Sequence, residues 1–136
     1  MFDPWGMLAG LPGWRVVWWP VARRGLTRWA DRLVLLDPGM RGDQERAVVT
    51  HELVHAARGP VPGWMQAREE AAVSAIAACL LVDVSHLMEA VAWSRVTVEI
   101  ADELRVDAAT VRARVAVLTA QERAAIDARL ELIVLP

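Results

Sequence analysis

Two histidines and a glutamate, in the run His51-Glu52-Leu53-Val54-His55, have the types and spacing best suited to chemistry. On a helix, residues four positions apart lie on one face, so both imidazoles can reach the same metal ion. Neutral imidazoles suit Zn²⁺, and two of them require a third protein ligand and leave a position for water. The metal lowers the pKa of that water, and Glu52 can take its proton during attack on a carbonyl and deliver it to the leaving amine. The pattern predicts a zinc peptidase site with His51 and His55 as ligands and Glu52 as general base.

The third ligand is expected from the next predicted helix, which begins near Glu69 and Glu70. The residues that follow, 71–82, carry no charged side chain. Either glutamate can also serve simply as a negative charge near the positive end of the helix dipole. The residue pattern alone therefore leaves the choice between the two open.

Attack on a carbonyl also benefits from a donor that polarises its oxygen, and the chain has no tyrosine. His86 is the remaining histidine, but its place after Ser85 at a predicted helix start favours a surface position. Arg58 lies one turn beyond His55 and is the other candidate. A cation in the last turn of a helix is also favoured by the dipole, and we expect Arg58 to have that end-of-helix role.

The elements that hold these residues follow from hydrophobic periodicity and turn residues. Apolar β-branched and aromatic runs predict strands at 14–19 and 32–36, with a turn and a short strand between them over 23–29. Asp43 is expected to be the N-cap of the metal helix, which ends before Gly59. Further helices are expected at 66–82, 86–93, 97–105 and 107–118, and from the capping box Thr119–Glu122 toward residue 132. The predicted fold class is α+β: a small N-terminal antiparallel sheet, two metal-binding helices and a C-terminal helical segment.

The predicted strand at 32–36 comes just before the metal helix and is expected at the sheet edge beside the metal. An edge strand offers unpaired N–H and C=O groups to an extended substrate segment. Such pairing predicts that a substrate is recognised through its backbone, in a flexible or locally unfolded stretch.

The metal residues and the helix after them resemble the ImmA/IrrE metallopeptidase family. In that family a glutamate precedes Ala-Asn-x-Phe-Ala and a Leu-Leu pair, and the matching segment here is Glu70-x-x-Val73-Ser74-x-Ile76-Ala77-Ala78-x-Leu80-Leu81. Aligning the leucine pairs implies that Glu70 is the third ligand, with Glu69 as the alternative. The resemblance extends to the segment 32–37 and to Glu45-Arg46, and it covers about residues 10–118. Val73-Ser74 replaces the usual Ala-Asn, and Val54 stands where relatives often carry glycine, but neither change removes a group that the mechanism needs.

The resemblance implies a Zn²⁺ cofactor and an intracellular protein substrate. Small family members from phages and mobile elements cleave or inactivate a helix-turn-helix repressor, which implies a repressor as the partner. Two alternatives stay open: a non-catalytic zinc-containing protein that binds a repressor, and a DNA-binding regulator that uses its C-terminal helices. Glu52 favours the enzyme over the non-catalytic protein, because a structural zinc site has no use for a base beside an open coordination position.

Residues 100–115 resemble a helix-turn-helix, two short crossed helices joined by a tight turn at Val106. Arginines at 105, 112 and 114 could contact phosphate, but the four arginines between residues 95 and 114 are balanced by Glu99, Asp102, Glu103 and Asp107. We therefore expect a packing or substrate-docking module rather than a DNA reader, and the ImmA/IrrE family carries a similar segment after its core. The chain is expected to divide into a zincin-like core, residues 1–93, and a C-terminal helical segment, residues 94–136.

Bulk properties exclude several classes of protein. With 136 residues, 55% of them hydrophobic and 24% charged, the chain should fold around a real core, and its net charge of −2 argues against a generally basic nucleic-acid binder. The single cysteine, Cys79, cannot form an internal disulfide and is expected to pack as a small core residue in a reducing compartment. No signal-peptide pattern is present near residue 1, and the uncharged run 71–82 is short for a membrane span, so a cytoplasmic protein is expected.

Burial is expected for two sets of apolar residues. The helix at 66–82 has a nearly unbroken apolar surface and is expected to be buried on most sides. Most tryptophans that precede the metal helix are expected in the core or on the sheet face, because a small sheet needs large side chains to bury enough area: Trp5, Trp14, Trp18, Trp19 and Trp29.

Overall fold

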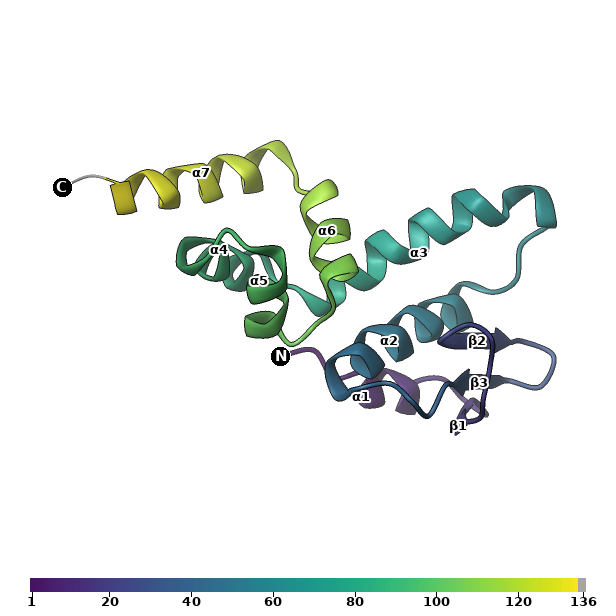
Figure 1. Ribbon diagram of the computed structural model, residues 1–136. Coiled ribbons are helices and arrows are strands. Elements are labelled where there is room, and N and C mark those ends of the chain that lie inside the picture. The colour runs from purple at the N-terminus through teal and green to yellow at the C-terminus, as the bar shows by residue number, and fades with distance from the viewer. Residues whose placement is uncertain (135–136) are drawn as a thin grey trace.

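The computed structural model describes residues 1–134, which form three short strands, seven α-helices and one 3-10 helix (Figure 1). In chain order the elements are α1 (Pro4–Ala9), β1 (Arg15–Trp18), β2 (Gly25–Arg28), β3 (Leu33–Leu36), α2 (Gly42–Arg58), η1 (Gly63–Met65), α3 (Gln66–Leu81), α4 (Val84–Trp93), α5 (Thr97–Leu104), α6 (Ala108–Ala116) and α7 (Ala120–Val134). The fold is α+β and mostly helical, as the hydrophobic pattern predicts. Figure 1 shows the sheet with α1 and α2 at one end, α4 to α7 at the other, and α3 running between them.

The sheet has the strand order β1-β3-β2 and is mixed. β3 pairs in parallel with β1, Arg15 opposite Leu33, and antiparallel with β2, Gly25 opposite Leu36. The prediction of an antiparallel sheet is therefore wrong for β1. The physical reason is that β3 is the most apolar strand, with Val34 and Leu36 fully buried, and it takes the centre, where both sides of its backbone are paired.

The central position of β3 also makes the edge-strand prediction for residues 32–36 wrong. The edge strand that contacts α2 is instead β2. It alternates buried Gly25 and Thr27 with exposed Leu26 and Arg28, so one face of the strand rests on α2.

α2 packs against the sheet through a small aliphatic core. Val49 and Leu53 of α2 are fully buried with Val34 and Leu36 of β3. The short helix α1 adds partly buried residues to this core and was not expected from the sequence. Its signal was present at the capping residues, because the Asp3 side chain accepts a hydrogen bond from the Trp5 N–H at 3.0 Å and Pro4 occupies the first turn.

The ends of α2 differ slightly from the prediction. Arg41 rather than Asp43 is the N-cap, and Asp43 lies in the first turn, where a carboxylate favours the helix dipole. The helix ends at Arg58, and Gly59 follows with a φ of 88°, a left-handed conformation that suits glycine.

α3 is buried along one face only, so the prediction of burial on most sides is wrong. Val73, Ala77, Ala78 and Leu81 are buried, and the opposite side exposes several apolar residues, Cys79 among them. The reason is that α2 and α6 cover only one side of α3. The expected core position of Cys79 is therefore also wrong.

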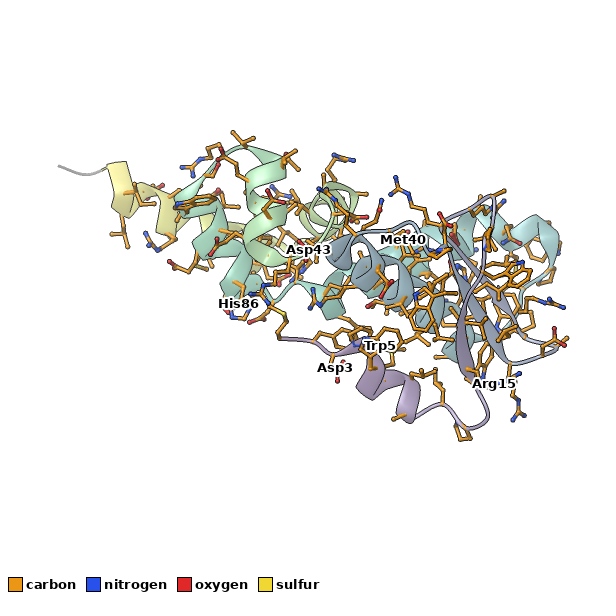
Figure 2. All side chains as sticks on the ribbon, turned by 60° about the horizontal axis from the view of Figure 1, so that its bottom comes forward. Asp3, Trp5, Arg15, Met40, Asp43 and His86 are labelled. Carbon is orange, nitrogen blue, oxygen red and sulfur yellow. The ribbon has the colours of Figure 1, made fainter. Side chains whose placement is uncertain are left out.

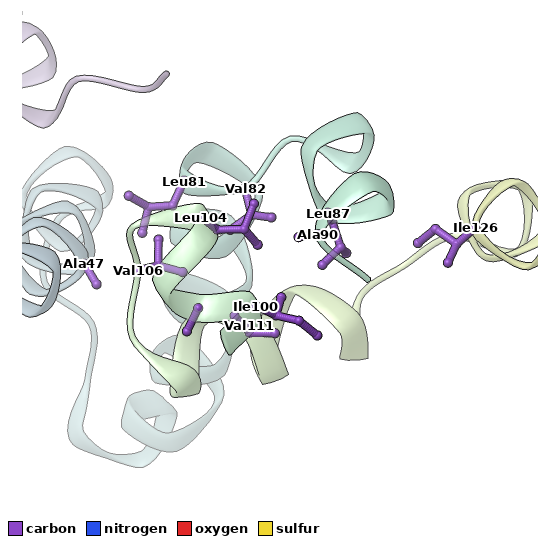
Figure 3. Close-up of a cluster of buried hydrophobic side chains, with 11 residues drawn as sticks. Ala47, Leu81, Val82, Leu87, Ala90, Ile100, Leu104, Val106, Val111 and Ile126 are labelled. Carbon is purple, nitrogen blue, oxygen red and sulfur yellow. The ribbon is translucent and has the colours of Figure 1, made fainter. Parts of the chain in front are cut away.

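The C-terminal helices share a core that reaches back to α2. Figure 3 shows this cluster extending from Ala47 of α2, past Leu81 and Leu104, to Ile126 of α7. α4 packs on α5 and α7, α5 on α6, and α6 on α3. The expected boundary after residue 93 falls between α4 and α5, two helices in contact.

Two local predictions in this segment are confirmed. The turn between α5 and α6 lies at Arg105, whose φ of 57° is left-handed, and Val106. In the capping box before α7, the Thr119 hydroxyl accepts from the Glu122 N–H and the Glu122 carboxylate accepts from the Thr119 N–H, both at 3.0 Å.

The tryptophans are less buried than expected. Among those before α2, Trp5, Trp18 and Trp19 are exposed by 41% to 64% of their surface, and only Trp14 and Trp29 are partly buried. The core face of the narrow sheet is filled by aliphatic residues, and Trp5 and Trp18 pack on each other at its margin with ring centroids 5.9 Å apart.

No single helix within residues 1–134 is long and apolar enough to cross a membrane. α3 with η1 and α4 reach that length and composition only together, and the pair is bent by 78°.

Candidate metal centre

α2 presents His51 and His55 side by side. The two residues are one helical turn apart, their ring centroids are 5.0 Å apart, and the rings meet edge-on at 69°. The helix is fixed by Val49 and Leu53, which pack against the sheet on a different face. The His55 side chain is 10% exposed and that of His51 23%, so the pair lies at the boundary between core and solvent.

Glu70 of α3 meets both imidazoles with one carboxylate. Its Oε1 lies 2.9 Å from His51 Nε2 and its Oε2 lies 2.6 Å from His55 Nε2. Packing of Val54 of α2 against Val73 and Ala77 of α3 sets the distance between the two helices. Burial raises the pKa of the Glu70 carboxyl, but the hydrogen bonds and charges of His51 and His55 outweigh burial, and the net pKa is lowered.

These donor atoms are of the kinds that zinc binds, and together they could hold a metal ion. The nitrogen and oxygen atoms of His51, His55 and Glu70 all lie within 4.8 Å of one another. Around a tetrahedral zinc with bonds of about 2.1 Å, neighbouring donor atoms would be about 3.4 Å apart. The observed contacts of 2.6 and 2.9 Å are shorter, because here the Glu70 carboxylate is hydrogen-bonded directly to the two imidazoles. Glu70 is 47% exposed, which leaves the cluster open on one side.

Glu69 has a different partner. Its carboxylate receives two hydrogen bonds from the Arg58 guanidinium, 3.0 Å from Nε and 2.7 Å from Nη2. The hydrogen bond from Arg58 is the main reason that the pKa of Glu69 is lowered. The structure therefore brings Glu70, and not Glu69, to the two histidines, and Arg58 pairs with Glu69 in addition to lying in the last turn of α2.

The two carboxylate oxygens of Glu52 have different surroundings. Oε2 accepts a hydrogen bond from the Thr27 hydroxyl at 2.5 Å, and the same hydroxyl lies 3.1 Å from the Glu52 carbonyl oxygen. Oε1 has no hydrogen-bond partner within the residues that the structure describes. No buried side-chain oxygen there lacks a partner, so Oε1 is reached by solvent although the Glu52 residue is only 8% exposed.

Gly25 allows β2 to approach Glu52 closely. A Cβ at this position would lie 2.8 Å from Glu52 Cγ and 2.8 Å from Val48 Cγ1, closer than carbon atoms can approach. Neither Gly25 nor Thr27 was found from the sequence. A glycine at a strand start is a signal of close backbone approach, but it does not name the partner.

Trp29, just after β2, contacts His55, the second residue of the histidine pair. Its indole N–H donates to the His55 carbonyl at 3.0 Å, and its ring meets the His55 imidazole edge-on with centroids 6.1 Å apart. β2 and the residues after it thus contact α2 at Glu52 and at His55.

Two cavities adjoin this cluster. The larger, of about 320 Å³, extends between α2, α3 and α6, and α6 contributes Ala109, Thr110 and Ala113 to its lining. The smaller, of about 80 Å³, lies toward His55 and Trp29. Four residues line both cavities: Arg23, Gly25, Glu52 and Glu70.

Other candidate residues lie elsewhere. His86 is exposed on α4 and lines a separate cavity with Met1 and Phe2. Figure 2 shows it on the helical side of the molecule, away from Arg15 of β1. Arg114 is buried and donates to the Val82 carbonyl at 2.8 Å and to Glu122 at 2.9 Å, whereas Arg105 and Arg112 are exposed.

Comparisons with models of known protein families, with curated proteins and with solved structures find no match for this chain.

Proposed function

We propose that this protein is a zinc-dependent endopeptidase that acts on an intracellular protein. The observation that carries the proposal is the convergence of His51, His55 and Glu70, with Glu52 in the lining of the two cavities that adjoin them. Two histidines and one carboxylate are a common ligand set of catalytic zinc, which keeps a fourth position open.

Each residue then has a defined part. His51, His55 and Glu70 would hold the ion, which when bound would supply a Lewis acid and a water whose pKa is near neutrality. Glu52 accepts the proton of the attacking water at Oε1, while Thr27 holds Oε2. The new bond joins the water oxygen to the carbonyl carbon, the carbon–nitrogen bond breaks, and Glu52 passes the proton to the leaving amine.

A protein substrate suits the surroundings of the site. β2 is a sheet edge beside the metal cluster and offers backbone groups for pairing with an extended segment. The larger cavity, walled by α6, has room for a side chain beside such a segment. The resemblance to the ImmA/IrrE family supplies the substrate class to test, a helix-turn-helix repressor from a phage or mobile element.

The alternatives fit these observations less well. A non-catalytic zinc protein has no need for a carboxylate oxygen left open beside the ligands. A DNA-binding protein that uses α6 would need to expose that helix to the DNA. Here α6 packs on α3, and the Arg114 guanidinium makes hydrogen bonds within the protein.

The experiment compares the zinc-loaded protein with its Glu52→Gln variant. Glutamine can still accept from Thr27 but cannot take a proton, and loss of a general base lowers the rate on the order of 10²- to 10⁴-fold. New protein N-termini are counted in a bacterial lysate after incubation with each protein, and zinc content and thermal unfolding are measured in parallel. Glu103→Gln, an exposed change away from both cavities, is the control. Equal numbers of new N-termini with wild type and Glu52→Gln would refute the proposal.

A further inference from the structure

The proposed reaction lacks one component, a donor for the oxygen of the scissile carbonyl. As water attacks, negative charge builds on that oxygen, and a fixed hydrogen-bond donor lowers the barrier. The chain has no tyrosine. Of the two other candidates in the sequence, His86 lies at a different cavity and Arg58 is bound to Glu69.

Arg23 is the cation that remains at the site. It lines the cavities on both sides of the cluster, together with Glu52 and Glu70. Its side chain is exposed and makes no hydrogen bond or ion pair with any residue between 1 and 134. The next residue, Arg24, is held differently, because its guanidinium lies as close as 2.6 Å to the Gln44 side-chain amide.

The backbone fixes where Arg23 can reach. Two residues later, Gly25 rests against Glu52, and the Thr27 hydroxyl is bonded to the same glutamate. The Arg24 carbonyl accepts from the Asp37 N–H at 2.9 Å, which ties the turn to the end of β3. The backbone of Arg23 is therefore held close to Glu52, while its guanidinium makes no hydrogen bond with the residues that the structure describes.

We infer that Arg23 is a catalytic residue of the proposed peptidase: its guanidinium donates to the oxygen of the scissile carbonyl as the tetrahedral state forms. The inference rests on the proposed function. A planar guanidinium can donate two parallel hydrogen bonds, which suits an oxygen that gains charge. Because this bond strengthens as charge develops, Arg23 should favour the transition state over the bound substrate.

The test measures binding to the zinc-loaded protein and needs no natural substrate. The probe is a dipeptide phosphonamidate, in which a tetrahedral phosphoryl group replaces the carbonyl of the scissile amide and the nitrogen is kept, and the reference is the parent dipeptide amide. Arg23→Gln should weaken phosphonamidate binding about 10- to 100-fold, by loss of one charged donor, and change amide binding much less. Arg23→Lys should recover part of the loss. The matched control is Arg28→Gln, which removes the same charge from an arginine paired with Asp31 at 2.6 Å outside both cavities.

The outcomes separate the two proposals. Wild-type protein that binds no zinc would contradict the proposed function itself. Zinc-loaded wild type that binds no phosphonamidate would also contradict the proposed function, whereas an Arg23→Gln variant that binds it as tightly as wild type would overturn the role of Arg23 alone. Weaker binding in both Arg23→Gln and Arg28→Gln would show a general charge effect and would also overturn it.

Discussion

In the proposed reaction, Thr27 determines which oxygen of Glu52 is available for proton transfer. Its hydroxyl engages Oε2 at 2.5 Å and leaves Oε1 open to solvent. A general base must be held within hydrogen-bond reach of the proton that it takes, so a carboxylate free to rotate would be aligned for only part of the time. In the proposed reaction, Thr27 would therefore position Glu52.

Replacing Thr27 tests this positioning role. Thr27→Val keeps the shape but removes the hydroxyl, and kcat is expected to fall on the order of 10- to 100-fold through misalignment, with zinc still bound. Thr27→Ser retains the hydroxyl and should restore most of the rate. Steady-state kinetics of all three proteins on a substrate found in the lysate experiment give the measurement. A serine variant as slow as the valine variant would contradict the role of the hydroxyl.

Gly25 gives a prediction about stability. Gly25→Ala places a methyl group 2.8 Å from Glu52 Cγ and Val48 Cγ1, so β2 or α2 must shift, at a cost of about 1–3 kcal/mol in the free energy of unfolding. Gly63→Ala is the matched control, because a Cβ there meets nothing within 4 Å. Urea unfolding measures both, and equal stabilities for the two variants would show that β2 does not press on Glu52.

The Arg58–Glu69 pair predicts a dependence of stability on pH. Because Arg58 lowers the pKa of Glu69 in the folded state, the pair stabilises the protein above the ordinary glutamate pKa of about 4.3. That contribution is lost as the pH falls through the lowered folded-state value. In wild type, the free energy of unfolding should fall as the pH drops below about 4.3, and this fall should be smaller in Glu69→Gln. Urea unfolding at several pH values gives the measurement. Zinc affinity should be unchanged in the variant. The same fall in both proteins would contradict the prediction.

At the scale of elements, the histidine pair was readable from the sequence because helical periodicity is local. Two residues four apart on a well-bounded helix share a face whatever surrounds them. The residue pattern alone did not identify which glutamate lies beside the histidines. Glu69 and Glu70 are adjacent on α3 and differ only in the direction in which their side chains point. The packing of α3 on α2 decides this, and it sends Glu70 to the histidines and Glu69 to Arg58.

The order of the strands could not be read from the sequence in the same way. Each strand was located from its own composition, but pairing depends on contacts between distant residues. The apolar run Leu33–Leu36 lies at the centre of the sheet, and β2 lies at the edge beside the His51–His55–Glu70 cluster. The contacts of Thr27 and Gly25 with Glu52 could not be predicted from the sequence either, because they form only when β2 packs on α2.

α6 gives a prediction about substrate selection. Ala113 lines the larger cavity, so Ala113→Leu should fill part of it and lower cleavage roughly 10-fold or more, a typical effect of methylene groups in a binding pocket. Ala116→Leu, at an exposed position outside the cavity, is the control. Cleavage and zinc content are measured together. Full activity in Ala113→Leu would show that α6 does not contribute to the substrate-binding surface.

At the scale of the whole molecule, the site lies where two cores meet. The aliphatic core under the sheet holds α2, and the larger C-terminal core includes Ala47 of α2 and Leu81 of α3. The helices that carry His51, His55 and Glu70 are therefore held in place by packing in these cores. The sequence predicted the helices of the C-terminal segment, but not that their core would extend to α2.

Zinc binding by the intact chain tests the proposed metal site. Isothermal titration of metal-free protein with Zn²⁺ should give one site per chain, and His51→Ala and Glu70→Gln should each abolish or greatly weaken it. Glu69→Gln should bind zinc like wild type, because its carboxylate is bonded to Arg58. Wild-type protein without a stoichiometric site, or undiminished zinc binding in His51→Ala, would contradict the account.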